Sequence, residues 1–419
     1  RGDVLAAAAG AEARGATGDD RGWLRSLVAE SDQIDDAEEA VQVLHLLAGL
    51  ARTAGWFDDA RAIEARASER LPQDFRGPLA LVLDAARTGD AAGATRALER
   101  LEGIEGTNSP RRQAAAAAAI IAAVRAESAE SGDGSQVNAK SRRKRLDEAR
   151  RLLRNAADAR KRWQTIAVLS ADIESIAGKQ SASLSDYERA VAFGPRNPLL
   201  IRELAAALDR ERRFAEAESF RDSVAPAGLS GGDRLAIDLL LGDREFAAAA
   251  DRALAVVDPA TADTTTLLWL GGLCLRAGRQ EKAIELFTQA TRVDPSNPDV
   301  WIGLARCRMG ERNTEAAAAA ITAGLAAVAE DDRRLLAARG AAVLGRTVEA
   351  EREFRDGVKQ GREPTDFAAR LVEFLVERGR GGEALVFLQE VVDRRWGQGK
   401  ELQSWAKSRL DGLRGGSSW

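Results

Sequence analysis

The chain has 419 residues, of which 45% are apolar and 30% charged, whereas aromatic residues contribute only 5%. This is a globular balance, and scarce aromatic residues with abundant Ala and Arg favour helices packed through small side chains over a β-sandwich. The net charge of −4 excludes a generally basic nucleic-acid binder, and two cysteines with one histidine leave almost no material for a disulfide framework, a zinc site or a histidine-based catalytic centre.

Small and large apolar residues recur at helical spacing from residue 41 onward. Between residues 41 and 72, apolar positions three and four residues apart fit two helices joined near Gly55, and Pro72 ends the second. The next stretch repeats the pattern from Phe75, with Gly89 at the corresponding turn. No single helix pair buries its apolar side alone, so we expect successive pairs to stack on one another.

The repeat is interrupted once, between a helix expected from residue 110 and a helix that contains Ala149. Ala149 arrives about 20 residues later than the preceding spacing predicts, and the intervening stretch SAESGDGSQVNAKSRRKR is polar and aperiodic. We therefore expect a mobile loop, inserted in one repeat, at about residues 127–145.

The insertion leads into the most basic stretch of the chain. Eleven Lys or Arg stand against three acidic residues between Ala139 and Trp163. On a helix, four of these cations would form one stripe beside an apolar stripe, namely Arg143, Arg150, Arg154 and Lys161. This pattern is typical of a helix that contacts phosphates or an anionic membrane surface. It is equally typical of a solvated helix face, which we favour because no aromatic residue is interleaved for base stacking.

The clearest copy of the repeated pattern is GRQEKAIELFTQATRVDPSNPDVW, residues 278–301. Pro295 cannot continue the helix before it, Asn297 is suited to cap the next helix, and Pro298 falls in the first turn, where a proline loses no hydrogen bond. The pattern returns at steps of about 34 residues toward the C-terminus. Cys274 and Cys307 occupy nearly equivalent places in adjacent helices and are expected to be small core residues, too far apart for an easy disulfide.

This spacing and these residue types closely resemble the tetratricopeptide repeat. The resemblance implies an all-α fold, a right-handed α-solenoid superhelix of about 10–11 stacked antiparallel helix pairs. We expect an incomplete N-terminal repeat at residues 1–40, the solenoid at 41–398, and a capping helix with a short tail at 399–419. Because the chain starts inside a unit and without methionine, we expect more repeats before Arg1 in a parent protein. The Ala- and Arg-rich composition suggests a bacterial coding sequence.

In this family, the first helices of the pairs line a concave groove that usually holds a segment of another protein. Carrying the groove positions over to this sequence predicts the partner-binding residues Arg202, Arg210, Leu268, Leu275, Arg276, Ile302, Arg306 and Arg339, followed by acidic positions at Glu373 and Glu377. These arginines predict a preference for acidic segments with apolar anchors. The Lys and Asn of the family's carboxylate clamp are absent, so recognition of chaperone tails is not supported.

The leading interpretation is therefore a non-catalytic scaffold or adaptor that binds a partner protein or peptide. Binding of nucleic acid or an anionic surface by the basic helix at 140–162 is the first alternative, and a structural spacer arm that self-associates is the second. No catalytic residue, metal site or cofactor is predicted, since no phosphate-binding loop, GxGxxG, HExxH or CxxC pattern occurs and His45 has no accompanying nucleophile motif. No apolar run is long enough to span a bilayer. We expect a soluble region in the cytoplasm or the periplasm, and the sequence does not decide between them.

Overall fold

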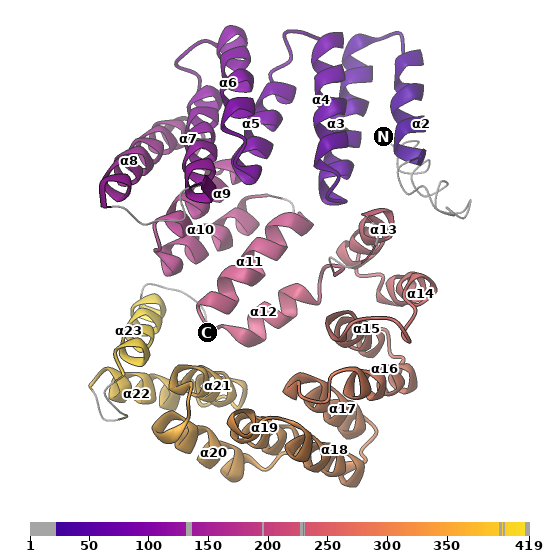
Figure 1. Ribbon diagram of the computed structural model, residues 1–419, viewed down its shortest axis with the longest axis vertical. Coiled ribbons are helices and arrows are strands. Elements are labelled where there is room, and N and C mark those ends of the chain that lie inside the picture. The colour runs from indigo at the N-terminus through magenta and orange to yellow at the C-terminus, as the bar shows by residue number, and fades with distance from the viewer. Residues whose placement is uncertain are drawn as a thin grey trace. The chain divides into compact units, whose positions relative to one another are not determined.

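The structure is a computed structural model that describes residues 22–130, 136–194, 197–226, 229, 231–393, 396 and 399–414 (Figure 1). These residues form 22 α-helices and one 3-10 helix, with no strand among them. The protein is therefore an all-α solenoid, as the resemblance to the tetratricopeptide repeat implied.

The contacts divide the chain into two compact units, Arg1–Leu204 with Ser230–Leu235, and Ala205–Leu229 with Ala236–Trp419. The first unit holds α2 (Gly22–Glu30), η1 (Ser31–Gln33), α3 (Ala37–Thr53), α4 (Phe57–Arg70), α5 (Arg76–Thr88), α6 (Ala91–Glu105), α7 (Pro110–Glu130), α8 (Gln136–Ala159), α9 (Gln164–Ile176), α10 (Gln180–Phe193) and the start of α11 (Pro198–Arg210). The second unit holds α12 (Phe214–Arg221), most of α13 (Gly231–Gly242), α14 (Phe246–Val256), α15 (Thr264–Arg276), α16 (Gln280–Val293), α17 (Pro298–Gly310), α18 (Thr314–Ala327), α19 (Glu330–Val343), α20 (Thr347–Gln360), α21 (Pro364–Glu377), α22 (Gly381–Val392) and α23 (Lys400–Arg414).

Within each unit, a first helix contacts both its own partner and the first helix of the next pair. In the first unit α5 packs on α6 and α7, and α7 in turn packs on α9. In the second unit α15 packs on α16 and α17, and α17 packs on α18 and α19. This neighbour-to-neighbour packing supplies the stacking that an isolated pair lacks.

The turn inside a helix pair has one recurring backbone geometry. Six glycines adopt a left-handed conformation there, with φ between 73° and 80°: Gly55, Gly89, Gly178, Gly278, Gly345 and Gly379. Three other pairs place an arginine in the same turn position with φ of 58° to 62°, namely Arg212, Arg244 and Arg312. A glycine accepts this conformation without steric cost, so the repeated glycines of the sequence mark the turns.

Close packing between successive pairs depends on glycines that face a large side chain. The ring of Phe287 on α16 lies between Gly271 on α15 and Gly303 on α17. A Cβ built at Gly303 would lie 2.3 Å from Cε1 of Phe287, and one built at Gly271 would lie 2.7 Å from Cε2. Both glycines therefore provide the space into which the Phe287 ring packs.

The predicted helix start at residues 295–298 is confirmed. Asn297 is the N-cap of α17, its side-chain oxygen accepts a hydrogen bond from the Asp299 N–H at 2.9 Å, and Pro298 is in the first turn. The same Pro-x-Asn-Pro sequence occurs at residues 195–198. There the Asn197 side chain also accepts a hydrogen bond from the Leu199 N–H, at 2.8 Å, and Pro195 lies outside the described residues. Cys274 and Cys307 are fully buried free thiols, as expected.

The prediction of a loop at about 127–145 is wrong for most of that stretch. Helix α7 runs through Glu130 and α8 begins at Gln136, so the interrupted repeat consists of two long helices of 21 and 24 residues. Ala, Gln, Lys and Arg are all favourable helix formers, and they let α8 begin well before its apolar stripe starts at Leu146. Residues 131–135 lie outside the described part of the chain.

At the C-terminal end, α23 (Lys400–Arg414) packs on α21 and α22. Trp405 and Leu410 of this helix are buried, at 9% and 5% exposure. Across the ranges that the structure describes, no helix combines the length and apolar character needed to cross a membrane.

Candidate functional site

The first helices of the second unit enclose a hollow of about 310 Å³. Five predicted groove residues meet there: Ile302 and Arg306 on α17, Arg339 on α19, and the acidic Glu373 and Glu377 on α21. The remaining lining residues come from α17, α19, α20, α21 and the turn after α21: Met309, Ala342, Val343, Phe354, Arg370, Phe374 and Arg378. The hollow thus combines an apolar floor with four arginines and two glutamates.

The two predicted arginines of this hollow differ in availability. Arg339 is only 12% exposed and forms an ion pair with Asp299 at 2.6 Å. Burial would raise the pKa of Asp299, but the neighbouring arginines, Arg339 foremost, together outweigh burial and lower it. Arg306 is 51% exposed and pairs with Glu218 at 3.2 Å. Arg306 is therefore the more accessible cation, whereas Arg339 also ties α19 to α17.

On α15, the predicted groove residues lie mainly against the core. Leu268 and Leu275 are half-buried and pack on the apolar cluster of α13 to α17. The Arg276 guanidinium donates a hydrogen bond to the carbonyl oxygen of Asp222 and lies 5.1 Å from the ring centre of Phe246. Burial lowers the pKa of Arg276, and it raises the pKa of the Asp222 carboxyl to about 6.

The two arginines predicted on α11 belong to different units. Arg202 lies in the first unit and is half-buried. Arg210 lies in the second unit, where its Nε donates to the Ala206 carbonyl of its own helix at 3.0 Å. That these residues share one groove with Arg339 stays a prediction.

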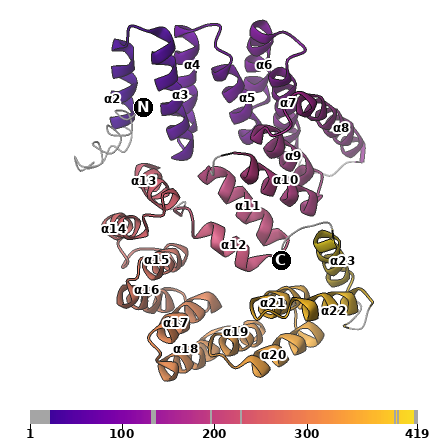
Figure 2. The ribbon, with the colours of Figure 1, turned by 180° about the vertical axis from the view of Figure 1, so that it is seen from behind.

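The short helix α12 (Phe214–Arg221) lies on the inner side of the second unit. Helices α14 to α23 follow an arc, and α12 lies inside it in both views (Figures 1 and 2). Its first residues contact α21, where the Ala215 N–H donates to Glu373 Oε1 at 2.9 Å and the Arg370 guanidinium lies 4.4 Å from the ring centre of Phe214. About 160 residues separate these partners in the chain. Periodicity reports which face of a helix is buried but not which distant helix covers it, so these contacts could not be read from the sequence.

The predicted basic stripe is only partly present. Arg143 and Arg154 are exposed on α8, but Arg150 is half-buried and pairs with Glu174 at 2.7 Å and Asp147 at 2.6 Å. Lys161 does not lie on this helix, contrary to the prediction, because α8 ends at Ala159 and the following residues turn toward α9. The stripe therefore consists of fewer free charges than the sequence suggested.

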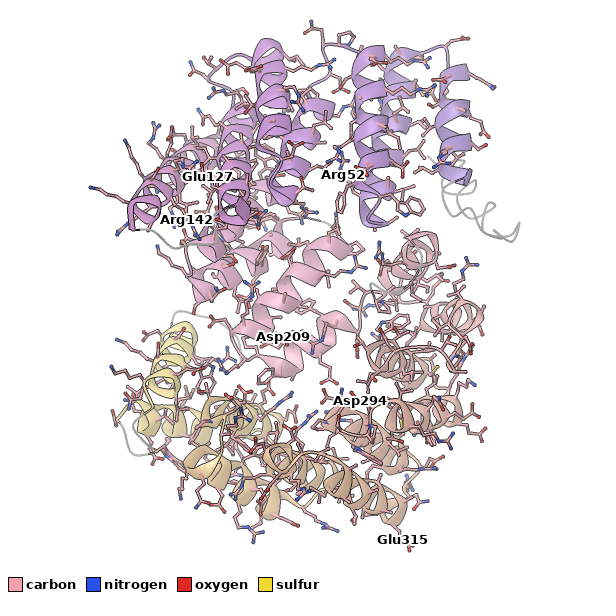
Figure 3. All side chains as sticks on the ribbon, in the orientation of Figure 1. Arg52, Glu127, Arg142, Asp209, Asp294 and Glu315 are labelled. Atoms are coloured by element: carbon pink, nitrogen blue, oxygen red, sulfur yellow. The ribbon has the colours of Figure 1, made fainter. Side chains whose placement is uncertain are left out.

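Two further arginines of the basic stretch contact α7 and α9. Arg145 forms an ion pair with Glu127, which is labelled on α7 in Figure 3. Arg142, also labelled there, donates a hydrogen bond to the Ile176 carbonyl at the end of α9. Both arginines serve contacts inside the first unit.

The single histidine is part of a buried charge network in the first unit. Its Nδ1 lies 2.7 Å from Glu64 Oε2 and its Nε2 lies 2.8 Å from Asp74 Oδ2. Arg52, labelled in Figure 3, joins Glu64 at 2.9 Å to Asp84 at 2.7 Å. Both ring nitrogens of His45 face carboxylates, an arrangement satisfied by the doubly protonated cation. Burial opposes this protonation, but the hydrogen bonds that the ring donates to the two carboxylates, together with their negative charges, outweigh burial and raise the pKa of His45. The network thus joins α3, α4 and α5 and was not anticipated.

Within the described ranges, no group of three or more His, Cys, Asp or Glu is arranged to hold a metal ion. The hollow in the second unit offers apolar side chains, an accessible guanidinium and carboxylates that can accept hydrogen bonds.

Comparisons with known proteins agree with the repeat. Two sequence models of the tetratricopeptide repeat match the chain, over residues 234–298 and 274–342. Similar solved structures include the APC/C hetero-tetramer Cut9-Hcn1 (14% identity, TM-score 0.35), yeast Tom70 (11%, 0.31) and a tetratricopeptide repeat protein from Parabacteroides merdae (13%, 0.25). The matches cover 94%, 94% and 64% of this chain, and 59%, 96% and 98% of those chains. The chain thus spans 59% of the first structure's chain. No curated protein matches the sequence. The two matched models identify tetratricopeptide repeats at residues 234–342, and helix pairs recur through both units.

Proposed function

We propose that this protein is a non-catalytic scaffold that holds an acidic, partly apolar segment of a partner protein against α17, α19 and α21. The observation that carries the proposal is the hollow in which Arg306 stands beside the apolar side chains of Ile302, Met309 and Phe374. Apolar anchors supply most of the affinity at such interfaces, while charged groups set specificity and association rate.

Arg306 is the residue on which recognition of an acidic segment would depend most. It is half exposed and its pair with Glu218 is a surface ion pair, which contributes only about 0–1 kcal/mol. A partner carboxylate can therefore replace Glu218 at small cost. Arg339 is less accessible, at 12% exposure, and pairs with Asp299 of α17.

Binding of an anionic surface remains the second candidate. Arg143, Arg154 and Lys161 are exposed, and none of them forms an ion pair with a described residue. Their attraction to phosphates would fall steeply with salt, whereas a peptide held by apolar anchors would lose less affinity.

The test is a pull-down from native lysate at low and at about 0.3 M salt, with protein and nucleic acid both assayed in the eluate. Wild type is compared with Arg306→Glu and with the control Arg333→Glu, which changes an exposed arginine at the start of α19 away from the hollow. We expect a defined protein that persists at the higher salt, is lost with Arg306→Glu and is retained with Arg333→Glu. Capture that is unaffected by Arg306→Glu would remove the groove function, and nucleic acid recovered only at low salt would favour the basic helix.

A further inference from the structure

We infer that α12 is a built-in ligand of this groove, and that the external partner presents the same pattern on a helix: an aromatic residue followed four residues later by a carboxylate. The inference rests on the proposed function. It adds the chemistry of the partner segment and states that this segment must displace α12 from the groove. The segment that carries the pattern is ERRFAEAESFRDS, residues 211–223.

The aromatic position is Phe214. Its ring is partly buried against the apolar cluster of α19 to α23 and lies 4.4 Å from the Arg370 guanidinium. A guanidinium over an aromatic face is favourable by cation–π attraction, and the neighbouring apolar side chains exclude water from the ring. Arg370 also pairs with Glu373 at 3.3 Å, so the groove presents a preorganised cation to the ring.

The first turn of α12 is also bound, by the side chain of Glu373 on α21. α12 has no side-chain cap of its own, and the Ala215 N–H donates instead to Glu373 Oε1 at 2.9 Å. A carboxylate at the N-terminus of a helix satisfies free N–H groups and complements the helix dipole. Glu373 therefore recognises a helical segment by its first turn, independently of that segment's side chains.

The carboxylate position is Glu218, four residues after Phe214 and on the same helix face. It pairs with Arg306 of α17 at 3.2 Å. Beyond the end of α12, the Asp222 carbonyl accepts a hydrogen bond from Arg276 of α15. The segment is thus held by α15, α17 and α21, the helices whose inner positions were predicted to bind a partner.

The residues just before α12 are held by contacts with α21 and α23. Arg212 occupies the left-handed turn position where most pairs have glycine, and its side chain bridges Asp366 at 2.7 Å and Glu401 at 2.6 Å. Trp405 of α23 donates a hydrogen bond to the Glu211 carbonyl at 3.3 Å. These contacts fix the position at which α12 enters the groove.

The occupant is held weakly enough to be exchanged. α12 has eight residues and buries only Ala217 fully, and a helix this short is unstable without its surroundings. Its ion pairs with the groove are at least partly exposed, so each contributes little. A partner with the same pattern at higher local concentration can therefore compete for the same side chains.

The experiment uses the full chain and a labelled synthetic peptide of residues 211–223, with binding followed by fluorescence anisotropy. Wild type is compared with the double variant Phe214→Ala, Glu218→Gln, which frees the groove, and with the control Ser219→Ala, an exposed position of α12. We expect the double variant to bind the peptide at least tenfold more tightly than wild type does, and the control Ser219→Ala to bind it as wild type does. Adding Arg370→Ala to the double variant should abolish binding. Circular dichroism checks that each variant keeps its helix content.

Equal affinity of wild type and double variant, or no binding by a folded double variant, would overturn the inference. If the double variant does not fold, hydrogen exchange of wild type decides: excess peptide should speed exchange at the α12 amides, and unchanged exchange refutes the competition. Failure of the proposed function would give a different result, because the pull-down would then capture the partner equally well with wild type and with Arg306→Glu. If the pull-down loses the partner with Arg306→Glu but captures no more of it with the double variant, the groove binds the partner and α12 is not a competing ligand.

Discussion

Replacing Gly303 by alanine should destabilise the second unit, although alanine is the better helix former. Gly303 lies inside α17, and a Cβ there would be 2.3 Å from Cε1 of Phe287, where ordinary contact begins at 3.4 Å. The Phe287 ring is only 5% exposed and also faces Gly271, so it cannot move aside into solvent.

The expected magnitude follows from two opposing terms. Overpacking of a filled core costs about 1–3 kcal/mol. The change from glycine to alanine inside a helix contributes about 1 kcal/mol in the opposite direction. We therefore expect the free energy of unfolding to fall by about 1–2 kcal/mol, because the clash is at the severe end and the neighbouring side chains are buried.

The matched control is Gly49→Ala, which makes the same chemical change inside α3 with no atom within 4 Å of the new Cβ. Here only helix propensity acts, and we expect a gain of about 0.5–1 kcal/mol. Urea unfolding followed by circular dichroism measures both changes, and hydrogen exchange assigns them to helices, since repeat arrays need not unfold in one step. If Gly303→Ala stabilises the protein as Gly49→Ala does, the account of close packing around Phe287 is wrong.

Two further predictions concern titratable groups. The raised pKa of His45 means that its protonation stabilises the fold fully below about pH 6.5 and that this contribution is lost as pH rises through the folded-state value. Urea midpoints of wild type should therefore fall above that pH, and His45→Gln should flatten the dependence; parallel curves would contradict the assignment. Burial raises the pKa of both thiols, that of Cys307 to about 12, so neither Cys307 nor Cys274 should be alkylated at about pH 8 until urea unfolds the chain. Rapid labelling of the folded protein, read by mass spectrometry, would show that the repeat core opens.

The sequence by itself determined the repeat and its local geometry. Helix pairs, glycine turns and the caps at Asn297 and Asn197 depend on residues within a few positions of one another, so spacing and residue type suffice to predict them. The apolar stripe expected beside the basic residues of α8 is likewise a local pattern, and its Ala149 and Leu153 are buried. The loop expected before them was wrong, because polar residues of high helix propensity are compatible with either a loop or a helix extension.

Only the tertiary structure decided which of these residues meet. Arg339 and Arg306 look equivalent in the sequence, yet Arg339 is only 12% exposed and pairs with Asp299, whereas Arg306 is half exposed and pairs with Glu218. The contacts of α12 with Arg370 and Glu373 join residues about 160 positions apart, and no local pattern encodes such a pairing. Local sequence fixes the helices because their hydrogen bonds are local, whereas the surfaces they bury and leave open depend on how the stacked pairs bring distant side chains together.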